Sequence, residues 1–287
     1  HDGPGIRTTV FFKGCPLTCR WCRNPEGLSI SEQHIHRPAR CLACGDCIEL
    51  CPQHALSPSD NGSFLDDEKC ILCRTCVSHC PSEAHEFIGI NMSVDAVVAE
   101  IQKDVVFYDQ SKGGVTFSGG EPLMQPEFLL GLLNACGSLD LHRTVDTTGY
   151  ADARLLLKVA DHTDLFLYDL KHMDPARHRK YTGVSNEKIL NNLKLLSGRG
   201  ADVNVRIPVI PGFNMDDENI ERTGSFILSL AGVNMVSLLP YHSAAAAKYS
   251  RLGIHCYNSE ISVPTDRDLL NIADRLERFG LQVNIGG

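Results

Sequence analysis

Cysteine is the residue that most constrains what this chain can fold into. Eleven of its 13 cysteines fall into three short clusters, with two or three residues between neighbouring cysteines. Such spacing is typical of thiolates that share a metal centre, whereas disulfide frameworks belong to much smaller secreted domains. We therefore expect a metalloprotein that works in a reducing compartment.

Eight of these cysteines form two copies of one pattern, Cys-x2-Cys-x2-Cys-x3-Cys-Pro, at residues 41–52 and 70–81. The pattern is that of bacterial ferredoxins with two [4Fe-4S] clusters, in which the fourth cysteine of each copy ligates the other cluster. The matching prolines favour clusters over a pair of zinc sites, which would use the same residue types. The expected ligand sets are Cys41, Cys44, Cys47 and Cys80 for one cluster and Cys70, Cys73, Cys76 and Cys51 for the other.

The third group of cysteines, Cys15, Cys19 and Cys22, supplies only three thiolates. A [4Fe-4S] cluster has four irons, so a cluster held here leaves one iron open for another ligand. The alternative is a zinc site of three thiolates that a distant histidine completes. Cys136 and Cys256 have no cysteine nearby, and we expect a buried helix residue and a surface residue.

The rest of the chain alternates short apolar strands with amphipathic helical stretches. We expect strands at residues 7–13, 115–118, 143–147, 165–170, 202–210, 235–240 and 281–285, and helices at 94–101, 126–136, 151–161, 186–197, 216–230 and 266–279. This order predicts an α/β fold in which helices cover a parallel sheet, either as a barrel or as a doubly wound layer. Residues 29–85 are rich in Cys, Pro, Asp and Ser and show little periodicity, which indicates a metal domain inserted between residues 1–28 and 86–287.

Polar groups lie at the ends of successive expected strands: Gly119-Gly120-Glu121, Asp146-Thr147, Asp169-Leu170-Lys171 and His242, with Arg206 inside a strand. With the Cys-x3-Cys-x2-Cys motif, they resemble the radical S-adenosylmethionine (SAM) superfamily. Residues 2–7 (Asp-Gly-Pro-Gly-Ile-Arg), 116–121 and 239–242 are more closely similar to activating enzymes of glycyl radical enzymes. The eight-cysteine insertion resembles the branch with two extra clusters. The resemblance implies a partial (β/α)6 barrel of the TIM type with an inserted ferredoxin-like domain.

This resemblance also implies an activity. A [4Fe-4S] cluster on the three-cysteine motif would cleave SAM reductively to methionine and a 5'-deoxyadenosyl radical, which takes a Cα hydrogen from a glycine of a partner enzyme. The implied partners are a glycyl radical enzyme, whose glycine loop residues 2–7 help to receive, and a flavodoxin or ferredoxin-type reductant. The extra clusters would relay electrons or serve a structural role. The alternatives are a radical SAM enzyme acting on a small molecule or another peptide, and an electron-transfer protein.

The same resemblance implies which residues bind SAM. They are Trp21, Cys22 and Arg23 near the adenosine, Gly120 near the methionine amino group, Asp169, Leu170, Lys171 and His242 around the remaining polar groups, and in addition Gly119, Glu121 and Arg206. A Na⁺ or K⁺ site is implied at Asp146, Thr147, Asp169 and the backbone oxygen of Tyr168. Each residue alone has an ordinary alternative as a turn, an ion pair or a packed histidine. Their order at successive strand ends favours a site.

The charge balance and hydropathy exclude some partners. The chain has 27 Lys and Arg against 35 Asp and Glu, a net charge of -8, and no long basic run, so we expect no nucleic-acid partner. Apolar runs such as residues 105–108 fall far short of the roughly 20 residues that cross a bilayer. The first residues carry no basic segment followed by an apolar one, so we expect a cytoplasmic protein.

Overall fold

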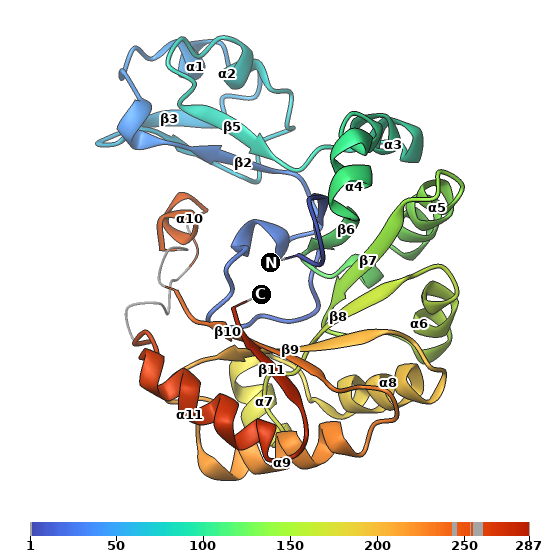
Figure 1. Ribbon diagram of the computed structural model, residues 1–287. Coiled ribbons are helices and arrows are strands. Elements are labelled where there is room, and N and C mark those ends of the chain that lie inside the picture. The colour runs from blue at the N-terminus through green and yellow to red at the C-terminus, as the bar shows by residue number, and fades with distance from the viewer. Residues whose placement is uncertain (1, 243–245, 253, 255–260, 287) are drawn as a thin grey trace.

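A parallel sheet of seven strands forms the larger part of the molecule (Figure 1). The computed structural model describes residues 2–242, 246–252, 254 and 261–286. Along the sheet the strands are β1 (Arg7–Phe12), β6 (Gly114–Gly119), β7 (His142–Thr147), β8 (Leu165–Asp169), β9 (Val203–Val209), β10 (Met235–Pro240) and β11 (Gln282–Ile285). All neighbouring strands are parallel, so their carboxyl ends meet at one edge. The sheet curves around residues 13–28, as expected for a partial barrel.

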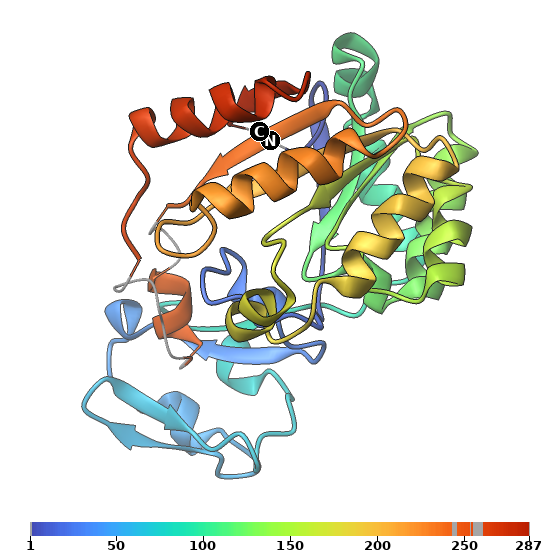
Figure 2. The ribbon, with the colours of Figure 1, turned by 90° about the horizontal axis from the view of Figure 1, so that it is seen from below.

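Helices cover the outer face of this sheet (Figure 2). They are α5 (Pro126–Gly137), α6 (Ala153–Ala160), α8 (Glu187–Gly198), α9 (Asp217–Leu228) and α11 (Asp266–Glu277). Helices α6, α9 and α11 are capped at their N-termini by Asp152, Asp216 and Thr265, whose side chains accept hydrogen bonds from first-turn N–H groups. Each expected strand is confirmed to within one residue and each expected helix to within two.

The two faces of the sheet differ in chemistry because strand side chains alternate between them. Residues facing the helices are apolar and buried, for example Phe117, Val145 and Val205. The alternate residues of the same strands, facing the interior of the partial barrel, are largely polar. They include Thr116 and Ser118 of β6, Thr144 and Asp146 of β7, Asp169 of β8 and Arg206 of β9. The interior of the partial barrel can therefore bind polar or charged ligands.

The inserted segment forms a smaller lobe beside the barrel (Figure 1). The sequence of this segment shows little periodicity, and no helix or strand was predicted in it. Two antiparallel pairs are present, β2 (Gln33–His36) with β5 (His85–Ile88) and β3 (Leu56–Ser59) with β4 (Gly62–Leu65). One-turn helices α1 (Asp46–Glu49) and α2 (Thr75–Ser78) follow the second cysteine of each motif. These elements are too short for periodicity to reveal them.

The insertion is an internal repeat with an offset of 29 residues, the separation of Cys41 and Cys70. Both one-turn helices, both strands after the motifs and both partner strands obey this offset, since β2 maps onto β4 and β3 onto β5. Left-handed backbone conformations repeat as well, at Ala43, Gly45 and His54 and again at Leu72, Arg74 and Glu83. The two cysteine motifs thus adopt one backbone shape twice.

Three helices of the barrel portion were not expected from the sequence. They are α4 (Val105–Ser111), α7 (Pro175–Thr182) and α10 (Ala246–Arg251). Helix α7 has no apolar stripe, and the two residues that it buries, His178 and Thr182, are polar. The expected helix behind Ser93 is confirmed as α3 (Val94–Gln102), with the Ser93 hydroxyl accepting from the Ala96 N–H. Over the described ranges, no helix combines the length and apolarity that a membrane span requires.

Candidate functional site

The three-cysteine motif lies in a loop, residues 13–28, at the carboxyl end of β1. The two ends of this loop are joined by hydrogen bonds from Gly14 N to Gly27 O at 2.8 Å and from Cys15 N to Leu28 O at 3.2 Å. Its middle is joined to the end of α7, where Thr18 N donates to Thr182 O at 2.8 Å. Backbone bonds on both sides therefore hold the cysteines in place.

The thiols of Cys15, Cys19 and Cys22 share one partly buried environment. Burial raises the pKa of Cys15 and of Cys19 to about 12 and also raises that of Cys22, and repulsion between the three sulfurs adds to the shift at Cys19. Lys171 is close enough to oppose this effect at all three. Buried thiols that resist ionisation become good ligands when iron stabilises the thiolate. This donor set fits an iron-sulfur cluster.

The Gly119-Gly120 turn after β6 packs directly on the cysteine loop. Gly120 N donates to Phe12 O at 2.8 Å, and Glu121 N donates to Gly14 O at 2.7 Å. A Cβ on Gly119, which has a φ of +109°, would lie 2.4 Å from Phe12 N, and one on Gly120 would lie 2.3 Å from Gly14 O. Both glycines are therefore required for loop packing, a reason that the sequence did not reveal.

Glu121 does not point toward the cysteine loop. Its carboxylate is fully buried and accepts hydrogen bonds from Thr147 Oγ1 at 2.7 Å, from Thr148 N at 2.8 Å and from Thr148 Oγ1 at 2.6 Å. Burial raises its pKa, while these donors favour the ionised form. Glu121 thus joins the turn after β6 to the end of β7, and its side chain acts by positioning the turn.

Four charged side chains form a network inside the barrel. Arg206 pairs with Asp146 and, at 3.1 Å, with Asp169, whose other oxygen accepts from Lys171 Nζ at 2.7 Å. Ser118 donates to Asp146 at 2.7 Å. Burial opposes ionisation throughout, but the two cations lower the pKa of Asp169, and Asp169 raises that of Lys171. Two buried carboxylates are thus balanced by two cations.

The remaining expected SAM contacts occupy different environments. Trp21 is buried, with its ring centroid 4.4 Å from that of Phe213, and Arg23 is exposed. The side chain of Leu170 lies in the hydrophobic core, so only its backbone faces the site. His242 is exposed two residues after β10 ends. The sequence therefore placed these residues at the correct edge of the sheet without resolving which side chains face inward.

The expected cation ligands lie at adjacent strand ends, with some of their atoms already engaged. The hydroxyl of Thr147 donates to Glu121 and accepts from Gly149 N at 2.9 Å. The Tyr168 hydroxyl donates to Ile189 O at 2.7 Å on the helix side of the sheet, so only its backbone oxygen faces the barrel.

Arg7, from the motif expected to receive a partner loop, lies at the opposite end of β1 from the cysteines. Its guanidinium donates to Val115 O at 2.7 Å and to the hydroxyls of Thr116 and Thr144 at 2.8 Å each. Its side chain thus closes the amino-terminal end of the strands. Asp2 is held nearby, since the Thr9 hydroxyl donates to its carboxylate at 2.9 Å.

Lys248 of α10 is a contact that sequence reasoning missed. Its ammonium group donates to Arg23 O and to Asn24 Oδ1 at 3.2 Å each and forms an ion pair with Glu26. It thereby ties α10 to the segment that directly follows Cys22. More than 220 residues separate the partners, so no local pattern could have revealed the contact. Cys256 lies outside the described residues, and Cys136 is buried in α5, as expected.

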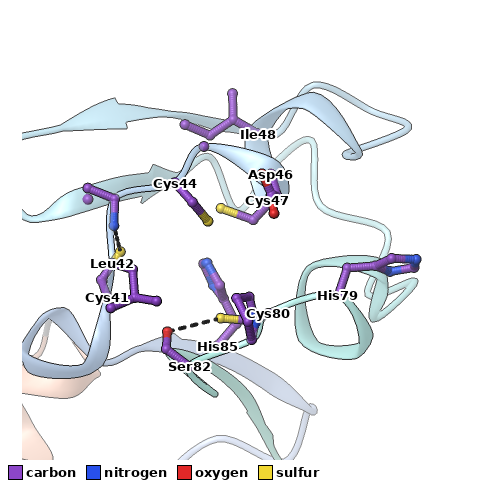
Figure 3. Close-up of a pocket in the computed structure, with 14 residues that line it drawn as sticks. Cys41, Leu42, Cys44, Asp46, Cys47, Ile48, His79, Cys80, Ser82 and His85 are labelled. Atoms are coloured by element: carbon purple, nitrogen blue, oxygen red, sulfur yellow. Dashed lines mark hydrogen bonds between the residues drawn. The ribbon is translucent and has the colours of Figure 1, made fainter.

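The eight cysteines of the insertion gather around two pockets. Site A is lined by Cys41, Cys44, Cys47 and Cys80 (Figure 3), and site B by Cys51, Cys70, Cys73 and Cys76. Each set takes three cysteines from one motif and the fourth from the other, the grouping expected from the sequence. Backbone N–H groups point at the sulfurs, with Ala55 N 3.3 Å from Cys51 and Ala84 N 3.2 Å from Cys80. A Cβ at Gly62 would lie 2.3 Å from the Cys41 sulfur. Both donor sets fit [4Fe-4S] clusters.

Comparison of the sequence with models of protein families shows to which family the chain belongs. A model of the radical SAM superfamily matches residues 69–223, which is more than half of the chain. The chain belongs to the radical SAM superfamily. Models of a 4Fe-4S dicluster domain and of a 4Fe-4S single cluster domain match residues 40–85 and 1–48. As a radical SAM protein with these domains, the chain uses SAM and iron-sulfur clusters, and its chemistry is the cleavage of SAM to a 5'-deoxyadenosyl radical.

Similar proteins place this radical SAM chain among the activating enzymes of glycyl radical enzymes. The trans-4-hydroxy-L-proline dehydratase activating enzyme of Clostridioides difficile is 46% identical over 100% of this chain and 96% of its own length. The choline trimethylamine-lyase activating enzyme of Oleidesulfovibrio alaskensis is 38% identical over 99% and 94%. A crystal structure of a domain of a Bacteroides vulgatus pyruvate-formate lyase-activating enzyme superposes with a TM-score of 0.53 at 36% identity, covering 61% of this chain and 99% of that one.

We expect Glu121→Ala to destabilise the turn after β6. The substitution leaves three buried donors on Thr147 and Thr148 without their acceptor, each at a cost of about 1–3 kcal/mol. The free energy of unfolding should fall by about 3 kcal/mol in urea denaturation, and SAM affinity in equilibrium dialysis should fall at least about tenfold. Glu127→Ala, an exposed glutamate of α5, is the control and should cost less than about 1 kcal/mol. Equal stability of the two variants would contradict a positioning role for Glu121.

Proposed function

We propose that this protein activates a glycyl radical enzyme, with one [4Fe-4S] cluster on Cys15, Cys19 and Cys22 and two more in the insertion at residues 29–85. The support is one juxtaposition, in which three partly buried thiols lie beside Lys171, itself paired with Asp169, at the carboxyl edge of the sheet. Three thiolates leave one iron for SAM, and paired charges beside that iron are what a zwitterionic methionine group requires.

The reduced cluster and SAM, when bound, supply the electron and the sulfonium group from which the 5'-deoxyadenosyl radical forms. The chain itself orients the substrate. Lys171 and Arg206 provide positive charge for the SAM carboxylate, and Asp169 provides a hydrogen-bond acceptor beside them. The backbone at Gly120 faces the methionine amino group. Trp21, Cys22, Arg23, Leu170 and His242 surround the adenosine and ribose, with Gly119 and Glu121 shaping the turn.

The partner protein contributes the glycine whose Cα hydrogen is removed. We propose that its loop enters the concave side of the partial barrel and meets residues 2–6, which Arg7 and Thr9 hold in place. The radical would form inside the barrel, so the entering loop also excludes water and other quenchers from the site. The trans-4-hydroxy-L-proline dehydratase and choline trimethylamine-lyase are the first partners to test, since relatives activating them match nearly the whole chain.

Anaerobic incubation with SAM and dithionite tests this proposal. We expect 5'-deoxyadenosine and methionine in chromatography, and a glycine-centred doublet in electron paramagnetic resonance only when a cognate glycyl radical enzyme is present. Cys19→Ala should abolish both signals, whereas Cys136→Ala, a buried cysteine of α5, should retain them. If 5'-deoxyadenosine forms with a small molecule or another peptide and no glycyl radical enzyme yields the doublet, the alternative radical SAM function replaces this one. No SAM cleavage would favour an electron-transfer protein.

The insertion is proposed to relay electrons from a flavodoxin or ferredoxin-type reductant to the three-cysteine cluster. Cys44 and Cys73 are the exposed cysteines of sites A and B, so a donor can approach either cluster. Such low-potential carriers and 11 cluster thiolates both require a reducing compartment, and we propose a cytoplasmic location.

We expect Cys44→Ala and Cys73→Ala to slow activation by flavodoxin at least about tenfold, because each removes one cluster ligand from the route. Activation by dithionite, which can reach the three-cysteine cluster directly, should change much less. Iron content and the paramagnetic signal of the SAM-bound cluster serve as controls for its integrity. Unchanged flavodoxin-driven rates with an intact SAM-bound cluster would leave the insertion with a structural role.

A monovalent cation, Na⁺ or K⁺, is proposed at Asp146, Thr147, Asp169 and the backbone oxygen of Tyr168. Burial raises the pKa of Asp146 despite its pairing with Arg206, and Asp169 adds to the rise. This carboxylate therefore gains from a further cation, which would also release Arg206 toward the SAM carboxylate.

We expect SAM to bind more tightly in KCl or NaCl than in choline chloride at equal ionic strength, by at least about threefold. Asp146→Asn should remove the difference between the salts, because it removes the charge that holds the ion. Equilibrium dialysis measures both. Equal SAM affinity in all three salts would rule out the cation.

A further inference from the structure

Three histidines that belong to no cysteine motif lie together on one face of the β2/β5 pair. His34 and His36 of β2 are alternate residues, and His36 pairs in register with His85 of β5. The ring centroid of His85 lies 5.0 Å from that of His34 and 4.8 Å from that of His36. His34 Nε2 and His85 Nδ1 are 2.9 Å apart, a hydrogen bond between two imidazoles.

This histidine group lies between the two cysteine pockets. The ring of His85 lines site A and points into it, toward the cysteine sulfurs (Figure 3). Nitrogen atoms of His34 and His85 and the sulfur of Cys76, from site B, all lie within 4.8 Å of one another. The Nε2 atom of His36 is buried without a hydrogen-bond partner among the residues that the structure describes. The group therefore contacts both sites and has polar atoms available to a ligand.

The 29-residue repeat shows that these histidines distinguish site A from site B. The residue equivalent to His85 is Leu56, which is buried and lines site B, and the residue equivalent to His36 is Leu65, which pairs with Leu56 and also lines site B. His34 is equivalent to Ser63: Ser63 lies beside Cys47 of site A, and His34 lies beside Cys76 of site B. Where Leu56 and Leu65 line site B, site A therefore has His85 in its lining and His36 beside Gly62.

The hydrogen bond between the rings decides where the protons lie. Nδ1 of His85 is engaged by His34, which leaves Nε2 for site A. The sulfurs of a bound cluster only accept hydrogen bonds, so Nε2 must carry a proton to contact them. In a neutral His85 ring, Nδ1 must then accept, and His34 Nε2 must donate. The pair is therefore a chain of donors directed from His34 through His85 into site A.

We propose that the His34–His85 pair donates a hydrogen bond to a sulfur of the cluster in site A and raises the reduction potential of that cluster above that of the cluster in site B. Donors to cluster sulfurs stabilise the reduced, more negatively charged state, and hydrogen bonding is one of the properties that set such potentials. His34 is a positioning residue, since it acts by fixing the tautomer and the orientation of His85. The inference rests on the proposed occupancy of both sites by clusters.

The test replaces each histidine by its equivalent in the 29-residue repeat and measures reduction potentials rather than turnover. The full chain is reconstituted with iron and sulfide in a background with Cys15, Cys19 and Cys22 changed to Ala, which leaves only the clusters of the insertion. A redox titration followed by electron paramagnetic resonance then gives two potentials. His85→Leu should shift the higher one to a more negative value, and His34→Ser should shift it in the same direction by less. The triple change H34S/H36L/H85L should bring the two potentials together.

Two further variants serve as controls for the shift in reduction potential. His85→Gln retains an N–H donor and should restore part of the shift, which also covers the case in which His85→Leu loses its cluster. His79→Leu is the matched control, because its equivalent is also a leucine, Leu50, and its ring points away from site A (Figure 3). Its potentials should equal those of the background.

The outcomes separate this inference from the proposed function. Iron and sulfide contents of the background below two clusters' worth would contradict the proposed occupancy of the insertion. With both clusters present, an unchanged higher potential in His85→Leu and in the triple variant would overturn the role of the histidines. Equal potentials of the two clusters before any histidine is changed would overturn it as well.

Discussion

The site depends on a short seam of backbone hydrogen bonds between the turn after β6 and the cysteine loop after β1. Gly120 N to Phe12 O, Glu121 N to Gly14 O and Gly14 N to Gly27 O join three segments at distances of 2.7–2.8 Å. Such bonds form only where backbones touch, which is why glycines stand on both sides of the seam. Because these hydrogen bonds connect the ends of the adjacent parallel strands β1 and β6, they hold the cysteine loop more rigidly than an ordinary surface loop.

The acidic side chains inside the barrel are stabilised in two different ways. Alternation along the strands directs Asp146, Asp169 and Arg206 inward, and the buried carboxylates are stable there because Arg206 and Lys171 neutralise them. Glu121 is more deeply buried than either aspartate yet has no cation near its oxygens in the described contacts, and it relies on hydrogen bonds from Thr147 and Thr148. The ion pairs of Asp146 and Asp169 can rearrange when a charged ligand binds, whereas the hydrogen bonds of Glu121 hold the turn after β6 in place.

The strands, their order and the residues at their ends could be predicted because those features are local. Short apolar runs predicted every strand of the seven-stranded sheet, and short cysteine spacings predicted three donor sets. What could not be predicted depends on contacts across the fold. The pairing of Lys248 with Glu26, the end of α7 under the cysteine loop and the direction of the Glu121 side chain all join segments distant in sequence. Leu170 shows the same limit, because motif membership does not decide which face of a strand a side chain takes.

In the insertion, two copies of one backbone repeat differ in the side chains around their proposed clusters, which would favour one cluster as the position of an electron. Two clusters in identical surroundings would have equal potentials, and an electron would have no preferred position between them. Here the backbone repeat is kept, while His85 and His36 stand at site A where Leu56 and Leu65 stand at site B, and His34 joins His85 from the side of Cys76. The His34–His85 hydrogen bond satisfies one buried nitrogen of each ring, whereas Nε2 of His36 is left without a partner among the described residues. Because an unsatisfied buried nitrogen costs stability, this exchange of leucine for histidine does not serve the fold, and a role at the cluster accounts for it better.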